Sequence, residues 1–248
     1  MITIALTAYN QLNYTRLCLE SILQYTQMPY KLVLIDNGST DGALLLFQKV
    51  ARLHDLTEII HYDINQVVED IGNKMMADVD TEFIIGVTND TIVHKDWDVN
   101  LIAALRSDPD IGMVGPRSNC ISGEQLLYPG KTYNNLEEYQ EVARHWAETH
   151  RGEYFQTQRV VGMLVAIRME AFRKSGGYDV NLPTNGPDGA YGYSDDDLSA
   201  KMIKAGYRLL ITNDVFIHHF GGVTVGNHNG LARNLKKYER IINGNHES

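Results

Sequence analysis

The sequence predicts an α/β protein with a central, mostly parallel sheet and helices on both faces. One observation is the apolar run at residues 83–87, because a strand covered on both faces carries apolar side chains at successive positions. A second is the order of segments in the first half, βαβαβαβ, which requires right-handed crossovers between parallel strands. A third is the polar residues that end the apolar runs, where open α/β sheets bind ligands.

The first half is expected to contain four strands and three helices. Apolar and small polar residues alternate from Ile2 until the first strand stops at Ala8. The next segment has apolar residues at helical spacing, and Pro29 closes it. Turn-forming residues 37–42 separate the second strand from a helix and supply its cap. The expected strands are residues 2–8, 32–35, 59–62 and 83–87, and the expected helices are residues 14–25, 43–53 and 65–79.

The second half is less regular. Asp96 is expected to cap a helix over residues 97–105, and a short strand follows at 111–114. An amphipathic helix is expected at 136–150 and a strand at 159–167. The glycine- and tyrosine-rich residues 176–193 are too irregular for a regular element, and loops of this length in compact domains are often functional. A helix that ends at Gly206 and strands at 208–211 and 215–217 complete the expected elements.

Composition excludes some classes of partner. The net charge is −9 and no cluster of Lys and Arg stands out, which argues against nucleic acid held through its phosphates. Cys18 and Cys120 lack the spacing of a metal site, which fits a reducing compartment. No signal peptide, no run of membrane-spanning length and no internal repeat is present, so a cytoplasmic location is expected.

Acidic residues and histidines stand where the sheet would present them to a ligand. Asp36 ends the second strand, where a carboxylate can accept hydrogen bonds from a base or ribose. Asp90 follows the run at 83–87, although Asn and Asp are also common in ordinary turns. Residues 195–197 are three successive aspartates in a first helical turn, more than capping requires. His218 and His219 end the last strand, and either is a candidate metal ligand.

Together these segments resemble family 2 glycosyltransferases of the GT-A fold, over nearly the whole chain. Residues 7–10 match the exit of the family's first strand, and residues 33–41 match its nucleotide-binding signature. Asn65 and Asn73 keep the spacing of the next motif, although Val67 stands where Gly is usual. The resemblance implies that the nucleotide sugar is bound by Thr7, Ala8, Tyr9, Asp36, Asn65, Asn73 and Asn89.

The resemblance also implies a metal site and a catalytic base. Residues 88–90 occupy the family's DxD position with only Asp90 retained, and His219 matches a late metal-binding histidine. Residues 194–198 resemble the segment Glu-Asp-x-Asp-Leu, with Asp195 at the catalytic carboxylate and Ser194 where Glu is usual. Asp196 and Asp197 remain the alternatives for the base. The nearest subgroup modifies peptides and proteins or is joined to tetratricopeptide repeats.

The expected function is therefore inverting glycosyl transfer that depends on Mn²⁺ or Mg²⁺. The donor is expected to be a nucleotide-diphosphate sugar, most often UDP-linked in this family, and the acceptor a hydroxyl group of a glycan or protein. One domain is expected over residues 1–248. Its donor half is 1–115, its acceptor-binding and catalytic half is 116–230, and a C-terminal helix and tail form 231–248. The antiparallel strands are expected in the second half.

Two alternatives remain open. A catalytically inactive module that binds nucleotide sugar or carbohydrate would account for Thr88 and Ser194 in place of acidic residues. A sugar nucleotidyltransferase would share the sheet order, but it should carry a glycine-rich phosphate loop after the first strand, where residues 7–12 lack glycine. The sequence names neither the donor sugar, the acceptor nor the oligomeric state.

Overall fold

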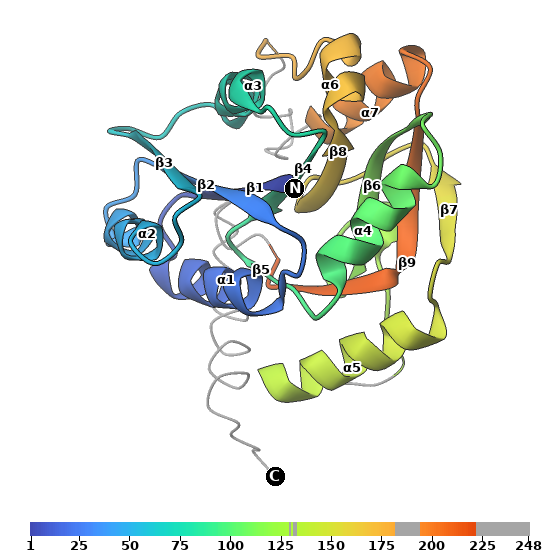
Figure 1. The fold of residues 1–248 in the computed structure, drawn as a ribbon, viewed down its shortest axis with the longest axis horizontal. Coiled ribbons are helices and arrows are strands. Elements are labelled where there is room, and N and C mark those ends of the chain that lie inside the picture. Colours follow the sequence, from blue (N-terminus) through green and yellow to red (C-terminus); the bar gives the residue numbers. More distant parts are fainter. Residues whose placement is uncertain (129, 131–132, 182–193, 222–248) are drawn as a thin grey trace.

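A computed structural model describes residues 1–128, 130, 133–181 and 194–221. In this part of the chain a nine-stranded sheet runs through the centre and helices pack on both of its faces (Figure 1). The predicted α/β class, with a mostly parallel sheet, is confirmed. The strands are β1 (Ile2–Ala8), β2 (Tyr30–Asn37), β3 (Thr57–Tyr62), β4 (Phe83–Thr88), β5 (Thr91–Ile92), β6 (Ile111–Ser118), β7 (Tyr154–Thr157), β8 (Leu164–Arg168) and β9 (Arg208–His219). The helices are α1 (Leu12–Tyr25), α2 (Ala43–Ala51), α3 (Val68–Asp78), α4 (Trp97–Arg106), η1 (Gly123–Gln125), α5 (Leu136–Thr149), α6 (Met169–Ser175) and α7 (Ser194–Lys204).

The first half of the sheet is the predicted parallel unit. Its strand order is β3-β2-β1-β4, and all three pairings are parallel. A helix follows each of β1, β2 and β3 and returns the chain to the start of the next strand, so the carboxyl ends of the four strands form one edge. The four expected strands and three expected helices of this half are all present.

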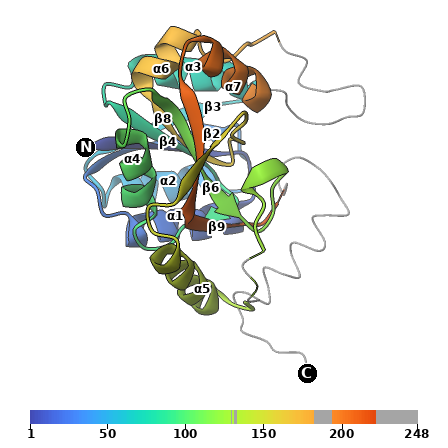
Figure 2. The same ribbon diagram turned by 90° about the vertical axis from the view of Figure 1, so that its right-hand side faces the viewer.

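The second half supplies the antiparallel part. Strand β8 lies between β4 and β6 and is antiparallel to both, whereas β9 is parallel to β6. Strands β5 and β7, labelled in Figure 1, pair with β9 in antiparallel fashion. Figure 2 shows β9 beside β6. This arrangement confirms the expected antiparallel portion. It brings the end of β9, far along the chain, beside the segment that follows β4.

Two details of the predicted second half are wrong. The strand expected at 159–167 begins only at Leu164, and the segment before it forms a loop. The strands expected at 208–211 and 215–217 are one strand, because the intervening polar residues are bonded to the loop before β7. The backbone N–H of Asn213 donates to the carbonyl of Glu153 over 2.7 Å, and the Asp214 carboxylate accepts from the N–H of Gly152 over 2.8 Å.

Asp96 also departs from its predicted role. It precedes α4 with a φ of 68°, and its side chain makes no capping hydrogen bond to that helix. Its carboxylate accepts a hydrogen bond from the Gln27 side chain instead. The backbone N–H groups of Gln27 and Met28 donate to the buried Asp98, over 3.0 and 2.7 Å. The two aspartates therefore bind the turn between α1 and β2.

The core is split by the sheet into two large apolar clusters. Alternate residues of β1 point to opposite faces, with Ile4 in the cluster under α1, α2 and α4 and Ala5 in the one under α3, α6 and α7. This explains why the central strands are apolar at nearly every position. A third cluster lies under α5, where the hydroxyl of Tyr139 is 2.8 Å from the Ile92 carbonyl oxygen.

No helix in the described ranges is long and apolar enough to cross a membrane. The predicted C-terminal helix and tail at 231–248 lie outside the described residues, as do positions 182–193 of the glycine- and tyrosine-rich segment. The expected division into donor and acceptor halves stays a prediction.

Candidate active site

The exits of three parallel strands lie side by side. In the register of the sheet, Ala8 at the end of β1 is opposite Asp36 on β2, and Thr7 is opposite Thr88 on β4. Tyr9 directly follows β1 and is half-buried. The residues predicted to contact a nucleotide from these strands therefore share one edge of the sheet.

Asp36 is fully buried at this edge and is held by protein groups. One carboxylate oxygen accepts a hydrogen bond from the N–H of Ser39 over 3.1 Å, and the other lies 2.8 Å from Nδ1 of His61. The His61 side chain is 38% exposed, so it is the part of this pair that reaches the surface. The sequence analysis missed His61, although it stands opposite Asp36 at the end of the neighbouring strand.

The loops after β1 and β2 are bound to each other. The Asn10 side chain accepts from the N–H of Thr40 over 2.8 Å, and the Asn10 N–H donates to Ser39 Oγ over 2.8 Å. The Asp41 carboxylate accepts from the N–H of Leu12 at the start of α1 and from that of Ala43 at the start of α2. One aspartate thus joins two helix N-termini at the candidate donor edge.

The three predicted asparagines bind other parts of the protein. Asn65 accepts a hydrogen bond from the Asn37 side chain over 2.7 Å. Asn89 donates to the carbonyl of Asn10 over 3.1 Å and so supports the loop after β1. Asn73 holds the backbone of Tyr178, donating to its carbonyl and accepting from its N–H over 2.8 and 2.9 Å. Their predicted contacts with a nucleotide sugar stay predictions. Asn65 and Asn89 position loops of this edge, and Asn73 positions the segment that follows α6.

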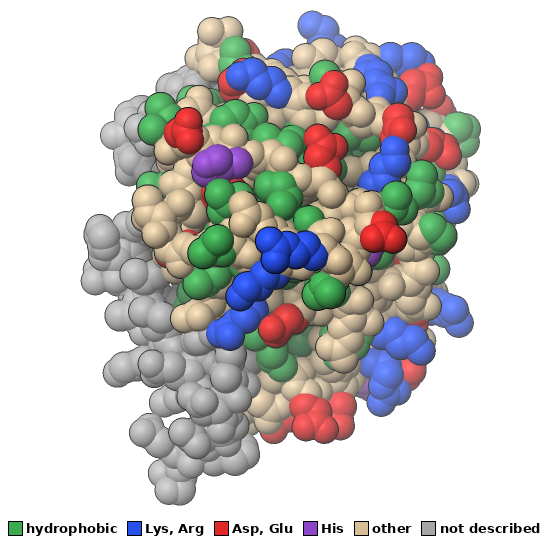
Figure 3. All heavy atoms as spheres, turned by 60° about the vertical axis from the view of Figure 1, so that its left-hand side comes forward, with side chains coloured by type: hydrophobic (Ala, Val, Ile, Leu, Met, Phe, Trp, Pro, Cys, Tyr) green, Lys and Arg blue, Asp and Glu red, His purple; other side chains and the backbone are tan. Residues whose placement is uncertain are grey.

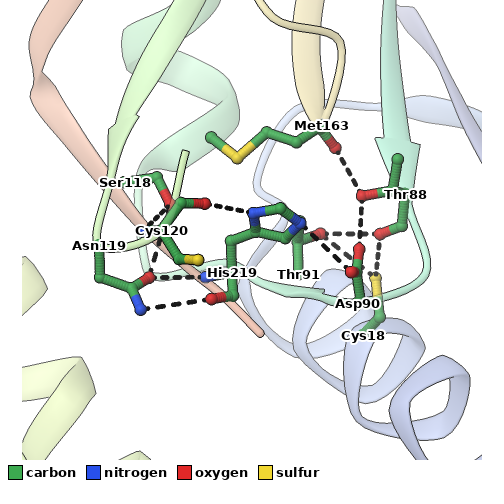
Figure 4. Close-up of polar contacts among 9 residues, drawn as sticks. All are labelled: Cys18, Thr88, Asp90, Thr91, Ser118, Asn119, Cys120, Met163 and His219. Carbon is green, nitrogen blue, oxygen red and sulfur yellow. Dashed lines mark hydrogen bonds and ion pairs between the residues drawn. The ribbon is translucent and has the colours of Figure 1, made fainter. Parts of the chain in front are cut away.

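Asp90 and His219 meet directly (Figure 4). Oδ2 of Asp90 lies 3.2 Å from Nε2 of His219, and Oδ1 lies 2.8 Å from the Thr88 hydroxyl. Burial alone would raise the pKa of Asp90, but His219 and the Thr88 hydroxyl outweigh it, and the pKa is lowered. Burial likewise opposes the charged form of His219, yet Asp90 raises its pKa. The two side chains therefore stabilise each other as an ion pair.

The two adjacent histidines point to opposite sides of β9. His218 is buried on the other side of β9, where its Nδ1 lies 2.7 Å from the Tyr133 hydroxyl and aromatic rings surround it. Successive residues of a strand point to opposite faces, so only His219 faces Asp90. The structure supports His219 as the candidate metal ligand.

The Asp90 carboxylate and the His219 imidazole are suitable as two ligands of a divalent cation. Nδ1 of His219 is hydrogen-bonded to the carbonyl of Cys120, so Nδ1 is the nitrogen that keeps its proton in the neutral ring. When Nε2 loses the proton of the ion pair, its lone pair can bind a cation beside Asp90. Two ligand atoms at right angles around such an ion lie about 3 Å apart, close to the separation seen here. Within the described residues, no group of three or more His, Cys, Asp or Glu side chains is arranged around a common point. Donor phosphates and water are further ligands that a cation held by these two side chains could take.

The three aspartates of α7 have different environments. Asp196 forms an ion pair with Nε of Arg159 at 2.9 Å, and Asp197 forms one with Nζ of Lys201 at 2.6 Å. Among the described residues, Asp195 forms no ion pair. It accepts a hydrogen bond from the N–H of Gly162, and its pKa is raised, chiefly by burial. These differences favour Asp195 as the base of the three.

A short loop connects Asp195 to the Asp90–His219 pair. A Cβ at Gly162 would lie 2.7 Å from Oδ1 of Asp195, so the close approach requires glycine. The carbonyl of the next residue, Met163, accepts from the Thr88 N–H over 2.9 Å and lies 3.0 Å from the Thr88 hydroxyl (Figure 4). Thr88 also contacts Asp90. A chain of contacts therefore links the candidate base to the candidate metal ligands. Asp36 lies at the end of β2, two strands from β4.

Glu69 on α3 is a second residue that the sequence analysis missed. Its carboxylate accepts a hydrogen bond from the hydroxyl of Ser194, the first residue of α7. The only signal in the sequence was the serine itself, which stands where the resemblance calls for an acidic residue.

Solved structures that superimpose on this chain include glycosyltransferases of the GT-A class. The mannosyltransferase PcManGT from Pyrobaculum calidifontis, in complex with GDP-Man and Mn²⁺, superimposes with a TM-score of 0.66 at 20% identity, over 96% of this chain and 62% of that chain. GalNAc-T7 with UDP, GalNAc and Mn²⁺ gives a TM-score of 0.67 at 16% identity, over 88% of this chain and 43% of that chain. The TarS structure from S. aureus gives 0.61 at 12% identity, over 97% and 66%. At these identities the likeness shows the fold, and it confirms the predicted GT-A architecture.

The sequence comparisons identify the family. Residues 3–176 match the model of glycosyl transferase family 2, so the chain belongs to this family and the predicted resemblance is confirmed. A putative glycosyltransferase from Bacillus subtilis (strain 168), EpsH, is 23% identical over 110 residues. That alignment covers 44% of this chain and 32% of EpsH, so the chain matches about a third of this curated relative's length.

Proposed function

We propose that the protein transfers a glycosyl group from a nucleotide-diphosphate sugar to a hydroxyl group of a glycan or protein, with inversion at the anomeric carbon. Asp195 is the proposed general base, and Asp90 and His219 are the proposed ligands of Mn²⁺ or Mg²⁺. The observation that carries the proposal is the connection from Asp195 through the loop at 162–163 to Thr88 and Asp90. This connection supports a single site for the proposed base and the two proposed metal ligands, at the edge where α/β sheets bind ligands.

The proposed reaction is a single displacement at the anomeric carbon. The acceptor hydroxyl gives its proton to Asp195 while its oxygen forms a bond to the anomeric carbon. The bond from that carbon to the diphosphate oxygen breaks on the opposite face, and its electron pair leaves with the nucleoside diphosphate. A divalent cation, when bound, would act as a Lewis acid on the diphosphate. The raised pKa of Asp195 suits this role because a carboxylate with greater proton affinity is a stronger base.

The nature of the donor follows from the site and from relatives. Asp36 and its partner His61 stand where a base or ribose would be bound. The similar solved structures contain GDP-Man in one case and UDP in another, each with Mn²⁺, which supports a nucleotide-linked sugar and favours Mn²⁺. We propose UDP as the nucleotide. The expected likeness to the subgroup that modifies proteins bears on the acceptor and stays a prediction.

Cellular location and partners are proposed on simpler grounds. Cys18 is a buried thiol whose sulfur lies 3.7 Å from the Thr91 hydroxyl, which supports a reducing compartment such as the cytosol. On the face drawn in Figure 3, acidic and basic side chains are interspersed among apolar and uncharged ones. That mixed surface supports small-molecule and glycan or protein substrates over nucleic acid.

The test is a screen of UDP- and GDP-linked sugars with Mn²⁺ by thermal shift, followed by assays of transfer and donor hydrolysis. A bound donor raises the apparent stability of the folded protein. Asp195→Asn is expected to lower turnover by about 10²–10⁴-fold while donor binding is retained. Asp196→Asn and Asp197→Asn are matched controls that should act through their ion pairs and lose less. Product NMR checks the anomeric configuration.

Two outcomes would contradict the proposal. Tight donor binding without transfer or hydrolysis, across donors and acceptors, would favour the inactive binding module that Thr88 and Ser194 suggest. Wild-type turnover in Asp195→Asn would reject this base and turn attention to Asp196 and Asp197.

A further inference from the structure

One face of α3 is directed at the start of α7. Gly72 and Asn73 lie three and four positions after Glu69, so both share this face of the helix with it. Asn73 holds the backbone of Tyr178 with two hydrogen bonds, and a Cβ at Gly72 would lie 3.0 Å from the Tyr178 ring. The helix thus packs closely against the segment that follows α6.

The third residue of this face, Glu69, reaches the helix that carries the candidate base. Its carboxylate accepts a hydrogen bond from the Ser194 hydroxyl, and Ser194 directly precedes Asp195. Because the hydroxyl donates to Glu69, Glu69 holds the first turn of α7 from outside the helix. The chain has a serine at position 194, and the carboxylate of Glu69 reaches it from α3.

Several groups around Asp195 influence its charge. Burial raises its pKa most, while the N–H of Gly162 and the guanidinium of Arg159 lower it. Asp196 on the same helix and Glu69 on α3 raise it. Tyr178 lies close enough that Asp195 and Glu69, after burial, raise the pKa of its hydroxyl. The start of α7 also favours the ionised carboxylate through the helix dipole. Glu69 carries the same negative charge as Asp195 but belongs to α3, and a hydrogen bond joins it to Ser194 of α7.

We propose that Glu69 is a positioning residue for the base: through Ser194 it fixes the first turn of α7, and its negative charge favours proton uptake by Asp195. This inference rests on the proposed function, in which Asp195 accepts the acceptor proton. It gives the site a second carboxylate that touches no substrate and acts through the base.

The decisive variant is Glu69→Gln, which keeps the side-chain shape and an acceptor for Ser194 but removes the charge. Asp70→Asn is the matched control, since it removes the same charge from the next residue of α3. Asp70 forms an ion pair with Nζ of Lys74 at 2.6 Å and its side chain is 41% exposed. The pKa of Asp195 is measured by carboxyl ¹³C NMR titration in each protein without substrates, and Asp195→Asn assigns its signal.

In Glu69→Gln the pKa of Asp195 is expected to fall by about half a unit or more, because a nearby like charge has been removed. In the transfer assay the acid limb of the pH profile of kcat should move down by the same amount. Above both pKa values kcat should fall about two- to threefold with little change in KM, because a weaker base accepts the proton less readily. Asp70→Asn should leave all three quantities at their wild-type values.

Ser194→Ala is the second variant, because it removes the hydrogen bond and keeps the Glu69 charge. It should lower kcat with little change in donor KM, since the first turn of α7 loses its anchor. The inference is overturned if the pKa of Asp195 is the same in Glu69→Gln, in Asp70→Asn and in the wild type. This titration needs no turnover, so it decides the role of Glu69 even if no donor is found. Full activity in Asp195→Asn would instead reject the proposed base while leaving the titration result intact.

Discussion

Nε2 of His219 lies 3.2 Å from Oδ2 of Asp90, which joins the end of β9 to the turn after β4. Because Nδ1 donates to the Cys120 carbonyl, the imidazole is oriented by the backbone and its other nitrogen is available to a cation. This relationship makes the proposed metal site testable without any substrate.

His219→Gln is expected to weaken Mn²⁺ binding by more than the 10–100-fold typical for loss of an outer-shell partner. Since Asp90 raises the pKa of His219, protons compete with the metal, and wild-type affinity should decrease as the pH falls through that pKa. Calorimetric titration with Mn²⁺ at two pH values measures both effects. His145→Gln, on the exposed face of α5, is the control. Equal Mn²⁺ affinity in the two variants would remove His219 from the site.

His61→Ala is expected to weaken UDP binding by about tenfold, which corresponds to about 1.4 kcal/mol. The reason is that His61 both holds Oδ2 of the buried Asp36 and exposes its own ring at the donor edge. Calorimetry with UDP and Mn²⁺ measures the change. His54→Ala is the control, because His54 precedes the opposite end of β3. If UDP affinity were the same with and without the His61 ring, the base would have to be bound elsewhere.

Gly38→Ala is expected to destabilise the protein more than Gly152→Ala. Both glycines have positive φ, at 81° and 72°, which costs alanine about 1 kcal/mol. At Gly38 a Cβ would also lie 2.6 Å from the backbone nitrogen of Asn65, whereas at Gly152 nothing lies within 4 Å. Thermal unfolding should place Gly38→Ala several degrees below Gly152→Ala. Matching unfolding temperatures would mean that the loops at 38 and 64–65 separate easily.

The buried His94 should make the folded protein less stable at acid pH. Burial lowers the pKa of His94 from 6.5 to about 4, so below pH 6.5 the unfolded chain binds a proton that the folded chain refuses. Above pH 6.5 His94 takes nothing from the free energy of unfolding. As the pH falls below 6.5 this free energy decreases, and the loss reaches about 3 kcal/mol at pH 4. Urea unfolding of wild type and His94→Asn at pH 7 and 4.5 measures the difference. The variant is expected to lose less stability between the two pH values, and parallel losses would contradict the assignment.

Much of the fold could be predicted from local patterns. The continuous apolar run at 83–87 and the alternation of elements before it determined the parallel half, because burial on both faces leaves a simple signature in the sequence. Near β7 and β9 prediction failed, because Asn213 and Asp214 resemble a turn until the loop at 152–153 binds their polar groups. That loop is distant in sequence, and no local pattern records the contact.

The candidate site divides in the same way. Local patterns were enough to place the strands of the first half, to single out Asp36, Asp90 and Asp195, and to indicate the family. The contacts of His219 with Asp90 and of Glu69 with Ser194, and the position of His218 on the other side of β9, emerge only in the folded arrangement. Residue types and their spacing indicate which groups a strand or helix carries. Which of those groups meet depends on sheet order and strand register, and these are set by packing between segments far apart in the chain.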